Sequence, residues 1–124
     1  MNMRYVHLSP RLSCALDMLR DSDVVADIGC DHGRLTAALL QNGCCEHVIA
    51  SDISEPSLQK AKQLLSYIGL SDRVSFRCGD GLTVLKPGEC EKIAMLGMGG
   101  TLMCDILSAS PQITGTLVLQ PMRA

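Results

Sequence analysis

A chain of 124 residues, of which 47% are hydrophobic and 19% charged, is long enough for one globular domain and too apolar to be disordered. Its formal net charge of −2 gives the whole chain no electrostatic preference for nucleic acid, so an RNA partner would have to bind a local basic patch. The sequence has no apolar run of the roughly 18 residues that cross a bilayer and no signal-peptide core at its start, which predicts a cytoplasmic protein without a membrane partner.

The first predicted elements are a helix, a strand and a second helix. Ser9-Pro10 is typical of a helix start, with the serine as N-cap, and the apolar spacing predicts a helix over 10–19. A buried strand is expected at 24–28. The helix after it, at 33–41, should end at Asn42-Gly43, a pair that favours a helix C-terminus.

The rest of the chain continues this alternation. We predict a strand at 47–52, a helix at 55–68, a strand at 73–77, a short helix at 82–85, a strand at 92–96, a helix at 101–108 and a strand at 115–120. Strands that alternate with helices are typical of a parallel sheet with helices on its faces. The prediction is therefore one α/β domain with a mostly parallel sheet.

The turn after the first strand is rich in glycine and acid. The strand runs into Asp27-Ile28-Gly29-Cys30-Asp31-His32-Gly33, whereas a dinucleotide-binding turn follows the pattern G-x-G-x-x-G. Two carboxylates, Asp27 and Asp31, would repel a pyrophosphate, which argues against a nicotinamide-dependent oxidoreductase. A ligand with an ammonium group and hydroxyls fits better, and S-adenosyl-L-methionine (SAM) is such a ligand.

Acids at the ends of the next two strands extend this pattern. Asp52 lies where a doubly wound fold places the acid that binds ribose hydroxyls, although it could instead cap the turn before the next helix. Asp80 lies between Gly79 and Gly81, where it could accept a hydrogen bond from an adenine amine or could cap the short helix that follows.

Two other features are candidates for substrate contact. The segment Gly97-Met98-Gly99-Gly100 follows the fourth strand, so its backbone either forms a structural turn or closely approaches a substrate. Arg11 lies in the first turn of a helix, where the helix dipole disfavours a cation; it is either a solvated side chain or a contact to substrate or cofactor.

The seven cysteines are an odd number without a repeating C-x-x-C pattern, which favours reduced thiols, several of them in the core. Cys30, His32, Cys44 and Cys45 are potential zinc ligands, but their spacing fits no common zinc pattern. We therefore expect no metal site.

Taken together, the acids at the ends of the first three predicted strands resemble those of class I SAM-dependent methyltransferases. The chain more narrowly resembles the bacterial tRNA (adenine-22-N1)-methyltransferase family. The segments that carry this resemblance are Leu8-Ser9-Pro10-Arg11-Leu12, Ala26-Asp27-Ile28-Gly29-Cys30-Asp31-His32-Gly33, Gly79-Asp80-Gly81-Leu82, Leu96-Gly97-Met98-Gly99-Gly100-Thr101-Leu102 and Leu117-Val118-Leu119-Gln120-Pro121.

The resemblance implies a Rossmann-like fold and methyl transfer from SAM to N1 of an adenosine in tRNA. It implies cofactor binding by Asp27, Gly29, Asp31, Gly33, Asp52, Ile53, Gly79, Asp80, Gly81 and Gly97. It makes Asp31, Gly97, Met98 and Gly99 the candidates for the catalytic centre, and Arg11, His32 and Gly100 the candidates for substrate contact.

The resemblance also implies more sheet than the five strands predicted for residues 1–124. Class I methyltransferases normally add two strands after the fifth, and this family adds a helical C-terminal domain suited to tRNA. We therefore expect a truncated form with weak tRNA binding and an exposed fifth strand, on which a homodimer could form. Two alternatives stay open, namely a SAM-binding fragment without activity and a methyltransferase that acts on another substrate.

Overall fold

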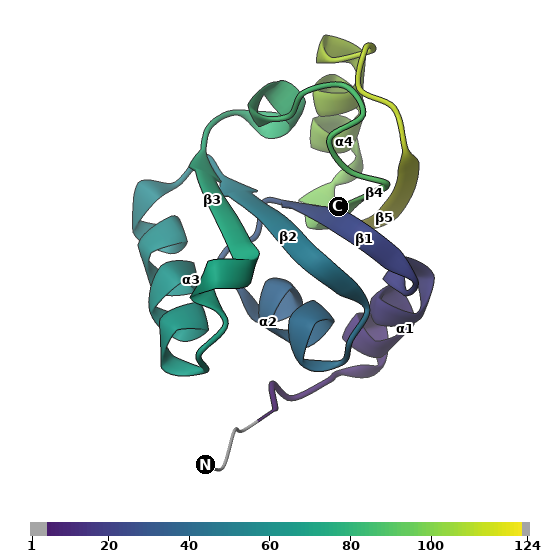
Figure 1. Ribbon diagram of the computed structural model, residues 1–124. Coiled ribbons are helices and arrows are strands. Elements are labelled where there is room, and N and C mark those ends of the chain that lie inside the picture. The colour runs from purple at the N-terminus through teal and green to yellow at the C-terminus, as the bar shows by residue number, and fades with distance from the viewer. Residues whose placement is uncertain (1–4, 123–124) are drawn as a thin grey trace.

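The computed structural model describes residues 5–122, which form one parallel sheet with helices on both faces (Figure 1). In chain order the elements are α1 (Pro10–Leu19), β1 (Ser22–Ile28), α2 (Arg34–Gln41), β2 (Cys45–Asp52), α3 (Glu55–Tyr67), η1 (Ser71–Arg73), β3 (Val74–Cys78), η2 (Gly81–Val84), β4 (Lys92–Gly99), α4 (Gly100–Ala109) and β5 (Thr116–Met122). The strand order is β3-β2-β1-β4-β5, and all four neighbouring pairs are parallel. The predicted α/β fold is confirmed.

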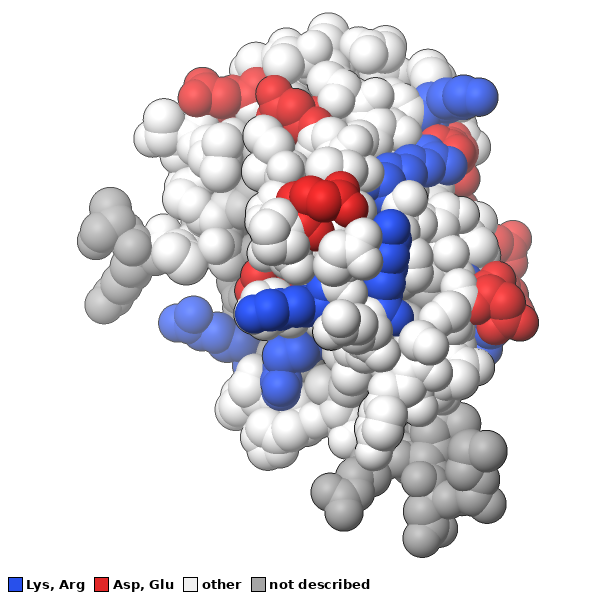
Figure 2. Space-filling model, turned by 90° about the vertical axis from the view of Figure 1, so that its left-hand side faces the viewer, with Lys and Arg blue, Asp and Glu red and all other residues white. Residues whose placement is uncertain are grey.

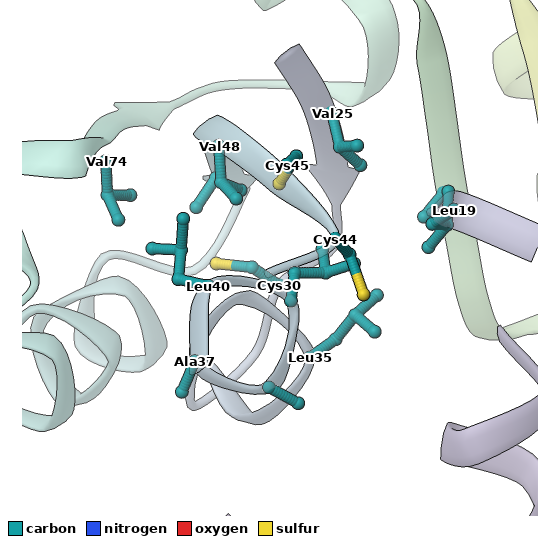
Figure 3. Close-up of a cluster of buried hydrophobic side chains, with 14 of the residues drawn as sticks. Leu19, Val25, Cys30, Leu35, Ala37, Leu40, Cys44, Cys45, Val48 and Val74 are labelled. Atoms are coloured by element: carbon teal, nitrogen blue, oxygen red, sulfur yellow. The ribbon is translucent and has the colours of Figure 1, made fainter. Parts of the chain in front are cut away.

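The sheet separates two hydrophobic layers. Helices α1, α2 and α3 cover one face, and α4 with the short helix η2 covers the other (Figure 1). In the first layer α2 lies at the centre, and its side chains pack against residues of the strands and of the neighbouring loops (Figure 3). The labelled residues of this layer are Leu19, Val25, Cys30, Leu35, Ala37, Leu40, Cys44, Cys45, Val48 and Val74.

Most predicted boundaries agree with the structure to within two residues. Ser9 is the N-cap of α1, because its hydroxyl accepts a hydrogen bond of 3.2 Å from the Leu12 amide. Strands β1 and β2 both begin two residues earlier than predicted, since Ser22 and Cys45 already pair in the sheet. The predicted helix at 82–85 is a 3₁₀ helix at 81–84.

The ends of β4 and β5 differ from the prediction. We expected β4 to stop at Leu96 before a glycine turn, but the strand continues to Gly99. A register shift between Leu96 and Met98 lets it pair with β5 beyond Gly97. Strand β5 likewise continues to Met122 through Pro121, which an edge strand tolerates because one side of its backbone needs no partner.

The cysteines are free, and Cys30, Cys44, Cys45 and Cys90 are buried, which confirms the expectation that several are core residues. Burial raises the pKa of the Cys45 thiol to about 12, so it stays protonated at neutral pH. Within residues 5–122, no three His, Cys, Asp or Glu side chains are grouped so that they could hold a metal ion. None of the described helices is both long and apolar enough to cross a membrane.

Candidate functional site

A cavity of about 400 Å³ opens at the carboxyl ends of β1, β2 and β4, where open parallel sheets bind their ligands. Its lining comes from the loops after β1, β2 and β3, the end of β4 and one face of α4. The lining residues are Ile28, Gly29, Asp31, Ser51, Asp52, Ile53, Ser57, Gly79, Asp80, Gly81, Leu96, Gly97, Met98, Leu102 and Ile106.

Most residues predicted to bind the cofactor meet in this cavity. Those that line it are Gly29, Asp31, Asp52, Ile53, Gly79, Asp80, Gly81 and Gly97. Met98, predicted as a candidate for the catalytic centre, lines it as well. Among the described residues that line it, three are carboxylates and none is Lys, Arg or His. The cavity therefore favours a ligand that carries positive charge.

The turn after β1 is held by backbone hydrogen bonds to β2. The Gly29 and Cys30 amides donate to the Ser51 carbonyl at 2.9 and 2.8 Å. Gly29 has φ +73° and Asp31 has φ +50°, so both take the left-handed conformation that a tight turn requires. This geometry places the Asp31 carboxylate at the cavity.

Asp52 connects two loops of the site. One carboxylate oxygen accepts a hydrogen bond of 2.8 Å from the Asp31 amide, and the other accepts one of 2.9 Å from the Ser54 amide. Asp52 therefore fixes the turn before α3, as one interpretation of the sequence expected. It also lines the cavity, and ribose binding by its carboxylate stays a prediction. Each carboxylate oxygen keeps a further lone pair for a ligand.

Asp80 is free of the structural role that was its alternative. It stands at the N-cap position of η2, but its side chain makes no capping hydrogen bond there. The loop is instead fixed by Arg77, which donates to both Glu89 oxygens and to the Val84 carbonyl. This hydrogen bonding lowers the pKa of Glu89 to about 2, so the ion pair stays intact at neutral pH. Asp80 thus lines the cavity on a loop that these hydrogen bonds of Arg77 hold in place.

Asp27 lies outside the cavity lining, beneath the turn. It is buried with 3% exposure, and the Thr36 hydroxyl donates a hydrogen bond of 2.7 Å to its carboxylate. Burial is the main reason that the pKa of Asp27 rises to about 6; the nearby Asp52 and Asp31 charges contribute to this rise, and the Thr36 hydrogen bonds oppose it. A contact between Asp27 and the ligand would therefore have to pass through the turn or a water molecule.

Gly33 also lies away from the cavity and has a packing role. It is the N-cap of α2 with φ +86°, and a Cβ there would come 3.0 Å from the Ala61 Cβ and 3.1 Å from the Ala61 Cα. Its small size therefore lets α2 and α3 approach each other.

The end of β4 forms one wall of the cavity, through Leu96, Gly97 and Met98. Gly97 has φ +70° at the register shift, and Met98 extends toward β1, since its terminal methyl lies 2.5 Å from where a Gly29 Cβ would be. Gly99 and Gly100 are not part of the cavity lining. Beyond the adjacent residues of the chain, no atom in the described part of the protein lies within 4 Å of a Cβ built on either glycine.

None of the three predicted substrate residues, Arg11, His32 and Gly100, is among the residues that line this cavity. His32 is exposed, and its ring nitrogen is 3.5 Å from a carboxylate oxygen of Asp31. Arg11 lines a second cavity of about 290 Å³, which shares Leu96 and Gly97 with the first.

Sequence reasoning missed several lining residues, of which Ser51 is the most informative. Its side chain is 1% exposed, and its hydroxyl has no hydrogen-bond partner among the residues that the structure describes. A serine directly before Asp52, at the end of the apolar run Val48–Ala50, was a usable signal. Leu102 and Ile106, four residues apart on one face of α4, were another.

Comparisons with known proteins agree with this geometry. A family model described as a methyltransferase domain matches residues 8–124. The tRNA (adenine(22)-N(1))-methyltransferase of Bacillus subtilis (strain 168) is 38% identical over 122 residues, an alignment that covers 96% of this chain and 51% of the relative.

Solved structures give the same result. The crystal structure of the B. subtilis M1A22 tRNA methyltransferase TrmK matches with a TM-score of 0.87 and 38% identity, covering 94% of this chain and 51% of that one. The M. capricolum TrmK structure in complex with S-adenosyl-homocysteine matches with a TM-score of 0.85 and 26% identity, covering 94% and 53%. This chain therefore spans about half the length of the relatives that it matches.

Proposed function

Because the chain belongs to the methyltransferase-domain family, we propose that it binds SAM in the cavity at the carboxyl ends of β1, β2 and β4 and methylates N1 of an adenosine in tRNA. The observation that carries the proposal is the cavity itself, which has three carboxylates and no basic side chain among its described lining residues. A ligand with a sulfonium and an ammonium group matches that charge. The adenosine-22 substrate follows the name of the B. subtilis relative.

Different residues of the chain bind different parts of the cofactor. Asp52 accepts hydrogen bonds from the ribose hydroxyls, and Asp80 accepts one from the adenine amine. The Ile53 side chain packs against the adenine ring. Gly29 and Asp31 surround the methionine part, which Asp27 and Gly33 support from below the turn. When bound, SAM supplies an electrophilic methyl group.

The acceptor chemistry needs little from side chains. N1 of adenine reacts through its ring lone pair, so no base has to remove a proton first, and alignment supplies most of the acceleration. Gly97, Met98 and Gly99 border the place of the acceptor base, with Gly100 beyond them and His32 at the rim. Asp31 stabilises the positive charge that the methylated base carries.

The matched relatives are about twice as long, so the tRNA affinity of these residues alone is expected to be weak. Since tRNA is the proposed substrate, the expected location is the cytoplasm. A homodimer through the edge of β5 also belongs to this proposal. The alternatives are SAM binding without activity and a different methyl acceptor.

Calorimetry with SAM and with NAD tests the cofactor. We expect heat of binding with SAM only, and a loss of SAM affinity of about 10- to 100-fold in Asp52→Ala and Asp80→Ala, the range for hydrogen bonds to charged groups. Asp72→Ala is the matched control, because Asp72 is an exposed acid on η1 that lies outside the cavity lining. Equal affinities in all three variants would contradict the cofactor site.

Transfer of a radiolabelled methyl group to an unmodified tRNA transcript tests the reaction. We expect label in a transcript with adenosine 22 and none in one with guanosine there, and a strong loss in Asp31→Ala. If SAM binds and neither transcript is labelled, the substrate assignment is wrong and one of the alternatives holds.

A further inference from the structure

Two cavities meet at the end of β4. The second one, of about 290 Å³, shares Leu96 and Gly97 with the cofactor cavity and is otherwise lined by the start of α1, the start of α2 and β5. Gly97 presents no side chain at this junction, and apart from its chain neighbours no atom of residues 5–122 lies within 4 Å of where its Cβ would be. At Gly97 the two cavities are therefore separated by backbone atoms only.

The two cavities have opposite charge. The first contains three carboxylates, whereas the second contains Arg11 and Arg34 and, among its described lining residues, no acid. A molecule that is anionic at one end and reacts in the cofactor cavity would therefore keep its anionic end in the second.

The guanidinium groups of Arg11 and Arg34 are available to a ligand. Elsewhere in residues 5–122, each arginine is paired with a carboxylate, as in Arg20–Asp17, Arg73–Glu46 and Arg77–Glu89. No such pair is formed by Arg11 or Arg34 within the same range. Arg34 instead donates to the His7 carbonyl at 3.0 Å through one nitrogen, which holds the side chain in place and leaves other donors over.

We propose that Arg11 and Arg34 bind backbone phosphates of the RNA next to the target adenosine, while the base crosses Gly97 into the cofactor cavity. This inference rests on the proposed function and adds the place and the residues by which the RNA backbone is held. Guanidinium groups suit the task because their fork of N–H donors matches two phosphate oxygens. The target base has to leave its stack to reach the methyl group, and anchored phosphates beside it hold the extruded nucleotide.

A second surface with basic side chains that could bind RNA is the side of the molecule that carries α3 and β3. Figure 2 shows Lys and Arg side chains there interspersed with Asp and Glu. Two of its cations, Arg73 and Arg77, are already neutralised by Glu46 and Glu89. Lys60 on α3 is exposed and forms no ion pair with any residue in 5–122, so it represents this surface in the test.

The experiment measures binding of a fluorescent, unmodified tRNA transcript by anisotropy at several salt concentrations. We expect Arg11→Gln and Arg34→Gln each to weaken binding by about 3- to 10-fold and to reduce the slope of log affinity against log salt by about 1, as for one lost phosphate contact. Arg34→Lys keeps the charge without the fork and should lie between the parent and Arg34→Gln. Lys60→Gln, the charge-matched control, should bind like the parent.

SAM affinity and thermal melting report whether the variants fold, and both should equal those of the parent. A double variant combines Arg11→Gln and Arg34→Gln. The proposal is overturned if this double variant keeps the parent's tRNA affinity and salt slope, or if Lys60→Gln weakens tRNA binding as much as Arg34→Gln does. It is also overturned if the SAM-bound parent binds no tRNA at low salt.

The outcomes separate this inference from the proposed function. If the parent labels tRNA and the double variant labels it equally well, the phosphate site is wrong and the methyltransferase function stands. If the parent labels no tRNA while the arginine variants lose RNA binding, the reaction is wrong and the RNA site stands.

Discussion

At the scale of single residues, burial of the Asp27 carboxylate lowers the stability of the folded protein at neutral pH. Burial raises its pKa from 3.8 in the unfolded chain to about 6 in the folded protein. At a pH between these two values the folded protein therefore keeps a proton on Asp27 that the unfolded chain has released. Stability contributed by this site is therefore highest below pH 4, falls as the pH rises to 6 and stays low above it. A shift of this size corresponds to about 3 kcal/mol.

We therefore expect Asp27→Asn to be more stable than the parent at pH 7.5, by up to about 3 kcal/mol, and to lose this advantage toward pH 4. Urea unfolding across this range measures it. The exposed Asp72→Asn serves as control and should show no such trend. Parallel stability curves for the parent and Asp27→Asn would show that the carboxyl is not destabilised by burial.

The same residue shows where sequence reasoning stops. The acids at the ends of β1, β2 and β3 could be predicted from their position after apolar runs, and Asp52 and Asp80 do line one cavity. The pattern could not show that Asp27 points to Thr36 on α2 or that Gly33 packs against Ala61. Those contacts depend on how α2 and α3 are placed against the sheet, which no local spacing encodes.

At the scale of elements, the alternation of strands and helices was predictable because each element has its own apolar period. The end of β4 was not, since three glycines in four residues favour a turn when read locally. Pairing with β5 overrides that preference: Met98 and Gly99 pair with Pro121 and Met122 across the register shift. Strand β4 therefore carries Gly97 into the wall of the cavity.

Two glycines of β4 allow a matched test of this geometry. Gly97 has φ +70°, whereas Gly99 has φ −65°, and a Cβ on either would lie more than 4 Å from every described residue except its chain neighbours. Because only the first needs the left-handed conformation, Gly97→Ala should cost about 1 to 2 kcal/mol and Gly99→Ala close to nothing. Urea unfolding of the two variants measures the difference. Equal costs would mean that strain at Gly97 does not define the register shift.

At the scale of the whole molecule, the sheet is covered unevenly. Among residues 5–122, edge strand β5 pairs with β4 alone, and its Leu117 and Leu119 are 41% and 42% exposed. They are two residues apart, so both lie on one face of the strand, opposite the buried Val118. An exposed apolar edge with unpaired backbone groups favours pairing with another strand, and a second copy of this chain offers the same edge.

We accordingly expect sedimentation velocity to show a dimer whose fraction rises with protein concentration. Leu119→Lys should shift the protein to the monomer, because a charge on the edge strand opposes pairing. Tyr67→Lys is the matched control: Tyr67 is 83% exposed but lies on α3, at the other end of the sheet, so the equilibrium should not change. A parent that sediments as a monomer at all concentrations, or a dimer that both variants weaken equally, would rule out this edge as the interface.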